Sequence, residues 1–217
     1  MSFPRVSAFS GLASPLVLAG ASLAFGALRP TYSPVAQTIS ELAEVGAPHS
    51  AEMVVAGFLL PGALMAIFGY GMMRSFGQGG KLALRALPFL LVGLGWFGAG
   101  VFPCGPCRGN EYNTTTSLHY LFASILEFSI VIQPFALRRR LADPARWPAW
   151  FPRYSLVTGF VIIVIYAMLT SSFGVAELMA YSGAFQRMFF AVFFVWMAGV
   201  ALPFARGIPA TKAAAPS

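Results

Sequence analysis

The sequence predicts an all-α integral membrane protein: a bundle of six transmembrane helices with both termini in the cytoplasm. Three features support this prediction: a strongly apolar composition, six long apolar stretches, and basic residues that fall on alternate loops. Of the 217 residues, 58% are hydrophobic and only 10% are charged, and the mean hydropathy is +0.73. A soluble domain usually has about a quarter of its residues charged. A soluble enzyme and a nucleic-acid-binding domain are therefore poor fits.

Six segments are long and apolar enough to cross a bilayer, whose hydrocarbon core requires a helix of about 20 residues. In chain order they cover residues 6–28, 53–73, 86–102, 117–137, 154–172 and 184–204. Each is predicted to be a helix, because backbone groups in lipid must find their hydrogen bonds within the segment. The first could be mistaken for a signal peptide, but its apolar run is long and no convincing cleavage site follows it. We therefore expect it to be retained.

Several segments contain residues that predict how the helices pack or what they do. Four glycines on the third segment predict close helix–helix approach: Gly93, Gly95, Gly98 and Gly100. Glu127 lies in the middle of the fourth segment, where an ionisable group is costly and is by default a functional hypothesis. The alternative is a protonated carboxyl bonded to a neighbouring helix. Four phenylalanines crowd the sixth segment, and we expect them to form a lipid-facing aromatic surface: Phe189, Phe190, Phe193 and Phe194.

The basic residues predict the orientation. Of the 14 Lys and Arg residues, 11 fall at the termini or on the loops after the second and fourth segments. Cytoplasmic loops are rich in Lys and Arg, so both termini are predicted to be cytoplasmic. The +7 net charge then reflects topology and attraction to anionic lipids, and no nucleic-acid partner is expected. We predict one domain over residues 1–207, a disordered tail over 208–217, and a location in the inner (plasma) membrane, since the Ala-, Gly- and Arg-rich composition is typical of bacteria.

Polar residues from three predicted outer segments lie at the same membrane level. Ser40 and Glu41 belong to the first outer loop, His119 opens the fourth segment, and Gln186 with Arg187 opens the sixth. Converging polar groups at one depth predict a binding pocket. The alternative for each residue alone is an interfacial side chain that reaches toward water. Thr38 with Glu41 also fits a capping box, which would explain Glu41 without any chemistry.

The two cysteines form a Cys-Gly-Pro-Cys sequence, Cys104 to Cys107, on the second outer loop. The spacing fits a thiol redox pair, but the βαβ context of thioredoxin-like proteins is absent. In an oxidising compartment the two residues could instead form a local disulfide that holds the loop. The sequence predicts no metal site and indicates no cofactor.

The order of these motifs resembles a family of membrane proteins grouped as domain of unknown function 998. The likeness rests on Tyr32-Ser-Pro, Ile39-Ser-Glu-Leu42 and Gly46-Ala-Pro48, then Val101-Phe-Pro-Cys104, Leu118-His119 and Gln186-Arg187. It implies a six-span topology and no established activity. Members often have an aspartate after the Phe-Pro-Cys run, where this chain has Gly105 and Pro106. The Ile39–Leu42 motif is also similar to six-span proteins of the Frag1/DRAM/Sfk1 type, some associated with lipid remodelling.

Three hypotheses for the function follow, and the sequence does not decide whether the protein is an enzyme. The first is an outer pocket that binds a lipid or small amphiphile, with Arg187 on an anionic headgroup and Glu41, Gln186 and Glu127 as further ligand-binding residues. Ser40 as nucleophile and His119 as base would extend binding to catalysis. The second is an accessory subunit of a larger membrane complex, docked through the phenylalanines of the sixth segment. The third is thiol–disulfide redox chemistry at Cys104 and Cys107. Membrane lipids are the expected partners, with other subunits in the second hypothesis.

Overall fold

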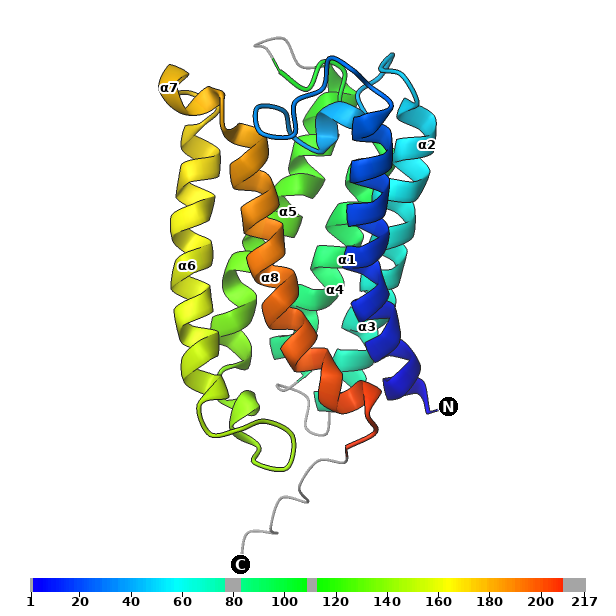
Figure 1. Ribbon diagram of the computed structural model, residues 1–217. Coiled ribbons are helices and arrows are strands. Elements are labelled where there is room, and N and C mark those ends of the chain that lie inside the picture. Colours follow the sequence, from blue (N-terminus) through cyan, green and yellow to red (C-terminus); the bar gives the residue numbers. More distant parts are fainter. Residues whose placement is uncertain (1, 77–82, 109–112, 209–217) are drawn as a thin grey trace, which may run out of the picture.

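A computed structural model describes residues 2–76, 83–108 and 113–208 of the chain, and within them it is a bundle of long helices (Figure 1). The long elements are α1 (Phe3–Ala27), α3 (Leu60–Phe76), α4 (Ala83–Val101), α5 (Thr114–Leu137), α6 (Phe151–Ser171) and α8 (Ser182–Ala205). Short elements are η1 (Ser40–Leu42), α2 (Ser50–Val54), η2 (Val55–Leu59), η4 (Arg140–Ala142) and α7 (Ala176–Met179). Because α2, η2 and α3 are continuous, the described residues contain six helices that are long and apolar enough to span a membrane.

The prediction of six membrane-spanning helices is confirmed, with one systematic difference at the helix starts. Every predicted segment begins two or three residues later than the observed helix, as in the fourth span, which starts at Thr114 and not at Ser117. The first turn of each helix extends beyond the apolar run into residues that suit the polar interface. Asn113 shows why, because its side-chain oxygen accepts the N–H of Thr116 and caps α5. Residues 209–217 of the predicted tail lie outside the described residues.

Neighbouring spans are arranged so that consecutive helices pack together and the last returns to the first: α1, α3, α4, α5, α6 and α8 (Figure 1). The glycines of α4 allow the closest approach, as predicted. A Cβ atom at Gly93 would meet the backbone of Ala66 on α3, and one at Gly98 would meet the ring of Phe122 on α5. The central position of α4 therefore depends on residues without side chains.

The second span contains a π-helical turn, η2, which ends at Leu59, two residues before Pro61. Proline has no N–H, so it cannot bond to the carbonyl of Gly57 four residues earlier. The indole N–H of Trp96 on α4 donates to that carbonyl instead, at 3.0 Å. The carbonyl of Pro61 itself accepts the hydroxyl of Ser14 on α1, at 2.9 Å. The irregular turn thus ties three helices together with polar bonds inside the bundle.

The expectation that the phenylalanines of the sixth span face lipid is wrong for three of the four, and the fourth, Phe194, is half-buried. Phe189 and Phe193 have no exposed surface and Phe190 is 5% exposed, so α8 presents these rings to the interior of the bundle. Phe193 packs on Trp196 and Phe89, with ring centroids 6.0 and 6.3 Å apart. A helix that is apolar on all sides gives no sequence signal for which face is buried. Its buried face is set by its position between α1 and α6.

Both ends of the described chain lie at the same end of the bundle, where the Arg5 side chain donates to the carbonyl of Ala205 at 2.9 Å (Figure 1). We call the opposite end the outer end, following the orientation that the basic residues predict. The first loop (residues 28–49), the second loop (102–108) and α7 lie there. Lys81, Glu111 and Lys212 lie outside the described residues.

Candidate functional site

The first outer loop folds back over the bundle and is held by a buried carboxylate. Glu41 Oε1 accepts the backbone N–H and the hydroxyl of Thr38, at 2.9 and 3.1 Å, and Oε2 accepts the amide of Gln37. The predicted capping box is therefore half formed: the Glu41 side chain reaches back to Thr38, whereas no side chain caps η1. Arg108 Nε also donates to Glu41 Oε1, at 2.9 Å. These bonds explain why a carboxylate can be buried at this position.

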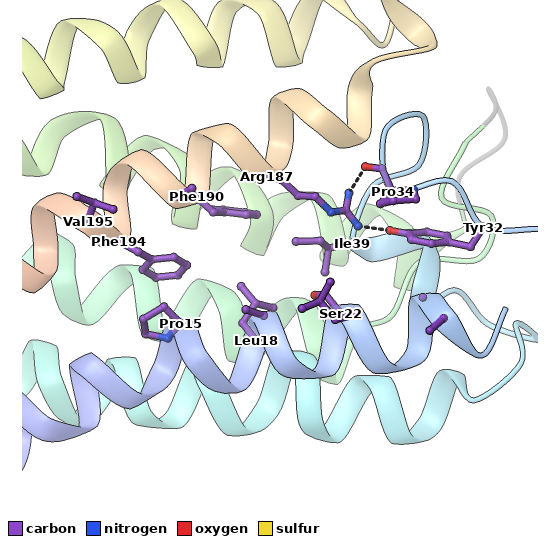
Figure 2. A pocket seen from close by; sticks show the side chains of 15 residues that line it. Pro15, Leu18, Ser22, Tyr32, Pro34, Ile39, Arg187, Phe190, Phe194 and Val195 are labelled. Atoms are coloured by element: carbon purple, nitrogen blue, oxygen red, sulfur yellow. Dashed lines mark hydrogen bonds between the residues drawn. The ribbon is translucent and has the colours of Figure 1, made fainter. Parts of the chain in front are cut away.

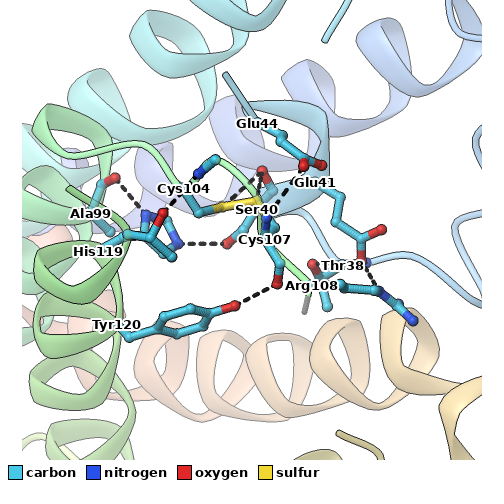
Figure 3. Close-up of a disulfide and its surroundings, with 12 residues drawn as sticks. Thr38, Ser40, Glu41, Glu44, Ala99, Cys104, Cys107, Arg108, His119 and Tyr120 are labelled. Carbon is cyan, nitrogen blue, oxygen red and sulfur yellow. Dashed lines mark hydrogen bonds and ion pairs between the residues drawn. A yellow bond between two sulfur atoms is a disulfide. The ribbon is translucent and has the colours of Figure 1, made fainter. Parts of the chain in front are cut away.

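The second outer loop is joined to the first around a disulfide between Cys104 and Cys107 (Figure 3). The two cysteines are 1% and 4% exposed, and their sulfur atoms lie 3.9 and 3.5 Å from the carbonyl oxygen of Ser40. Val45 donates its N–H to the carbonyl of Cys104, at 2.9 Å, and Tyr120 donates its hydroxyl to the carbonyl of Cys107. Both loops are therefore fixed to each other and to α5.

Ser40 and His119 form a side-chain pair beneath these loops. His119 Nε2 lies 3.1 Å from Ser40 Oγ, and Nδ1 lies 2.9 and 3.0 Å from the carbonyl oxygens of Ala99 and Phe102 (Figure 3). Carbonyl oxygens only accept hydrogen bonds, so Nδ1 must carry the proton of the neutral imidazole. Nε2 then presents its lone pair to Ser40, whose hydroxyl donates to it. In an activated serine nucleophile the hydroxyl likewise donates its hydrogen bond to the general base.

A small internal cavity of about 20 Å³ adjoins the pair. Its polar lining comes from Ser40, His119, Gln186 and Glu127, and its apolar lining includes Trp96 of α4. Such a volume and such a lining suit a single water molecule. Glu127 reaches this cavity from α5 and has the hydroxyl of Tyr166 on α6 beside its carboxyl. The mid-span carboxyl therefore has a neighbouring-helix partner, and it also lines the cavity that Ser40 and His119 share.

A second and much larger cavity opens between α1 and α8, with a volume of about 660 Å³ (Figure 2). Its walls are almost entirely apolar, for example Leu18 on α1 and Phe194 on α8. It extends from Pro15 and Val195, near the middle of their helices, to the first loop at the outer end. We call this cavity the lateral cleft. The volume lies within the range of about 300–1,000 Å³ that is usual for small-molecule sites.

Arg187 lies at the outer end of the lateral cleft. Its guanidinium donates to the carbonyl oxygen of Pro34, at 2.7 Å, and to the hydroxyl of Tyr32 (Figure 2). It also donates to the carbonyl oxygen of Gln37, at 2.9 Å. Burial raises the pKa of Tyr32 above its ordinary value, although Arg187 opposes that shift. The phenol therefore stays neutral. Among the described residues no carboxylate lies within ion-pair distance of Arg187, in contrast to Arg108.

The structure divides the predicted site residues between two places. Ser40, His119, Gln186 and Glu127 line the small cavity, while Arg187 lines the lateral cleft. Gln186 also accepts the N–H of Ile39 at 2.7 Å through its side-chain oxygen. Glu41 and the cysteines line neither cavity; they hold the loops above. In the part of the chain that the structure describes, no group of three or more His, Cys, Asp or Glu side chains could hold a metal ion.

Four residues shape this region although the sequence did not predict them as site residues. Tyr32 binds Arg187, Ile39 and Phe190 line both cavities, and Gly183 allows the first loop to approach α8. A Cβ atom at Gly183 would meet the carbonyl oxygens of Gln37 and Pro34, the same atoms that accept bonds from Arg187. Only the spacing of Gly183 and Arg187, one helical turn apart, could have suggested the connection.

A comparison with protein families identifies the family to which the chain belongs. A family profile described as "Protein of unknown function (DUF998)" matches residues 12–203. The match covers all six spans in whole or in large part, so the chain belongs to this family of membrane proteins. Neither a curated protein nor a solved structure matches the chain.

Proposed function

We propose that this integral membrane protein binds one anionic amphiphile, such as a lipid, in the lateral cleft between α1 and α8. The single observation that carries the proposal is an apolar cleft with an arginine at its outer end that forms no ion pair with any carboxylate of residues 2–76, 83–108 or 113–208. Acyl chains match the apolar walls, and an anionic headgroup matches the guanidinium, which binds such groups through charge-assisted hydrogen bonds.

The depth of the cleft supports an acyl chain of one leaflet as the occupant. On α1 its lining runs from Pro15 to Ala27, which is a rise of about 18 Å at 1.5 Å per residue. On α8 it runs from Arg187 to Val195, which is about 12 Å. Half of a hydrocarbon core is about 15 Å thick. The cleft thus has the depth of a single leaflet, with Arg187 at the headgroup level.

Ser22 supplies a second polar group within this cleft. Its hydroxyl oxygen is buried and has no hydrogen-bond partner in the structure, although Ser22 lines the cleft. Buried polar atoms in proteins are almost always bonded. An ester or hydroxyl oxygen of a bound amphiphile would provide that bond.

The two other sequence hypotheses receive less support. A thiol redox centre requires an exposed thiolate, whereas Cys104 and Cys107 are buried in the disulfide. The subunit hypothesis relied on a lipid-facing row of phenylalanines, and those of α8 are largely inside the bundle. The cleft is therefore the feature on which we base the function.

Native mass spectrometry of protein extracted gently from its own membrane tests the proposal. We expect the wild type to retain an amphiphile of defined mass, and we expect Ala19→Phe to lose it, because Ala19 lines the cleft and a phenyl ring would fill it. Leu16→Phe is the matched control, since Leu16 is 73% exposed and does not line the cleft. Equal retention by both variants, or a wild type without any bound amphiphile, would contradict the proposal.

The orientation of the cleft in the plasma membrane is also a proposal, supported by the distribution of basic residues. The chain has two cysteines, and both are in the disulfide. A cysteine introduced at Gly174, which has open space around it between α6 and α7, is expected to react with a membrane-impermeant maleimide in intact cells. Reaction only after the cells are opened would reverse the orientation.

A further inference from the structure

We infer that Ser40 and His119 form a nucleophile–base pair that cleaves a carboxylic ester of the amphiphile held in the lateral cleft. The inference deepens the proposed function and rests on it. It gives the site an activity and the substrate a chemical class: an anionic lipid with an acyl ester close to its headgroup.

The hydrogen bonds of His119 fix the direction of proton transfer. Two backbone carbonyl oxygens, of Ala99 and Phe102, hold the proton on Nδ1, and Nε2 faces Ser40 Oγ at 3.1 Å. A hydroxyl that donates to an imidazole lone pair is the geometry of nucleophilic catalysis, in which a third group orients the base. In this protein the backbone of α4 and the start of the second loop provide that orienting group. His119 is 2% exposed, so bulk water does not compete for these bonds.

The lateral cleft adjoins the small cavity that Ser40 and His119 line. Ile39, the residue before Ser40, lines both the lateral cleft and the small cavity, and so does Phe190. These two side chains lie between the substrate site and the pair, so the proposed reaction requires them to rotate aside and admit the ester to Ser40 Oγ. The carbonyl oxygen of Gln37, three residues before Ser40, accepts a hydrogen bond from Arg187. In the proposed complex Arg187 also binds the headgroup. An acyl ester lies only a few bonds from the headgroup of a glycerolipid, so a headgroup bound by Arg187 would place the ester close to the first loop, which contains Ser40.

The small cavity has the groups that the remaining steps require. Ile39 N–H donates to Gln186, so the atom of Gln186 that faces Ile39 must be Oε1. The N–H donors of the same amide are then available to the cavity that Gln186 lines. A donor beside the nucleophile can stabilise the oxyanion of a tetrahedral intermediate. The volume of about 20 Å³ accommodates one water molecule next to Ser40.

The reaction requires one water molecule and no other co-reactant. Ser40 Oγ attacks the ester carbonyl carbon while His119 Nε2 takes the hydroxyl proton. The ester C–O bond breaks, and His119 returns that proton to the departing alkoxide, which leaves as an alcohol. Water then attacks the acyl–serine ester, with His119 again accepting the proton, and Ser40 is regenerated with release of a carboxylic acid.

An alkyl fluorophosphonate tests the pair on the full-length protein in its native membrane. Attack by Ser40 forms an O–P bond and expels fluoride, and the adduct is located by mass spectrometry of the peptide that contains Ser40. We expect modification of Ser40 in the wild type and none in Ser40→Ala. Ser50→Ala, which alters another serine of the outer end, is expected to react like the wild type.

His119→Asn separates a catalytic pair from a structural hydrogen bond. The amide nitrogen of Asn can keep the donor to the carbonyl of Ala99, but Asn has no basic lone pair at the position of Nε2. We expect its rate of labelling to fall by roughly a hundredfold or more, the usual contribution of a general base. Labelling at the wild-type rate would overturn the inference, as would a wild type that retains its amphiphile and gives no Ser40 adduct. Labelling of a wild type that binds no amphiphile would instead support the pair and contradict the proposed function.

Discussion

Two arginines at the outer end, Arg108 and Arg187, differ in what neutralises their charge. Both donate to carbonyl oxygens of the first loop, Arg108 to Ala36 and Arg187 to Pro34 and Gln37. Arg108 also forms an ion pair with Glu41 and donates to a hydroxyl of α8, whereas Arg187 donates to neutral oxygen atoms of the described residues. The first cation holds the loops together within the protein. The second leaves a positive charge beside an apolar cleft, which is the arrangement that an external anion requires.

The largest effect is expected from removing the paired arginine. Arg108→Gln leaves the carboxylate of Glu41 buried without its cation, and breaking a buried pair costs about 3–5 kcal/mol. We expect the lower end of that range, because the side chain of Arg108 is 33% exposed. Thermal unfolding in mild detergent measures the loss. The double variant Glu41→Gln with Arg108→Gln should regain part of the stability, since no charge is left unpaired.

Arg187→Gln is the matched variant at the lateral cleft. It leaves no carboxylate without a partner, so we expect a cost of about 1–2 kcal/mol for its lost hydrogen bonds. Binding of the co-purifying amphiphile should instead fall at least tenfold. If Arg108→Gln and Arg187→Gln lowered stability and binding equally, the distinction between a structural and a ligand-binding arginine would be wrong.

Gly183→Ala tests whether the first loop must lie close to α8. The new methyl group would collide with the backbone carbonyls of Pro34 and Gln37, so the loop must move. We expect a loss of about 1–3 kcal/mol, as for other overpacked sites, together with weaker amphiphile binding, since the same carbonyls position Arg187. Gly174→Ala is the control, because nothing lies near its position. A neutral Gly183→Ala would mean that the loop tolerates displacement.

Ser22→Ala should produce a smaller effect, confined to the ligand. Its hydroxyl has no hydrogen-bond partner among the described residues, so stability should stay unchanged or rise slightly. Affinity for the amphiphile should fall about fivefold, the equivalent of one hydrogen bond of about 1 kcal/mol. Titration of the delipidated protein with the identified amphiphile gives the ratio. An unchanged affinity would show that the ligand does not use Ser22.

The smallest effect is expected at the disulfide. Because both sulfur atoms are buried under the outer loops, a reductant and a maleimide added to the folded protein should give little labelling of Cys104 or Cys107. Full labelling should follow denaturation in the same reductant. Rapid labelling of the folded protein would reopen the redox hypothesis.

The spans could be predicted because the bilayer demands about 20 apolar residues in each, a signal that any window of hydropathy detects. The close contacts of Gly93 and Gly98 were predictable for a similar reason, since small residues let backbones approach. The buried face of α8 was not predictable, because Phe189 and Phe193 lie on a helix that is apolar on all sides. Only the neighbours of α8 decide which side is internal.

The membrane level of the candidate site residues was predictable from the sequence, but which of them contact one another was not. The positions of Ser40, His119 and Arg187 along the chain place them at one membrane level, and the structure shows that Ser40 meets His119. Nothing in the sequence separates Arg187 from Arg108, although the two have opposite electrostatic surroundings. That difference depends on how the first loop folds over the helices. The lateral cleft depends on the spacing of α1 and α8, which are far apart in the sequence.

Photo-crosslinking directly tests whether a lipid acyl chain occupies the lateral cleft. The protein is reconstituted with an anionic phospholipid that carries a diazirine in its acyl chain, and the modified residues are mapped by mass spectrometry. The account predicts adducts concentrated on cleft residues of α1 and α8, such as Leu18 and Phe194, and their loss in Ala19→Phe. Adducts spread evenly over exposed lipid-facing positions, such as Val157 and Phe160 of α6, and unchanged in that variant would contradict it.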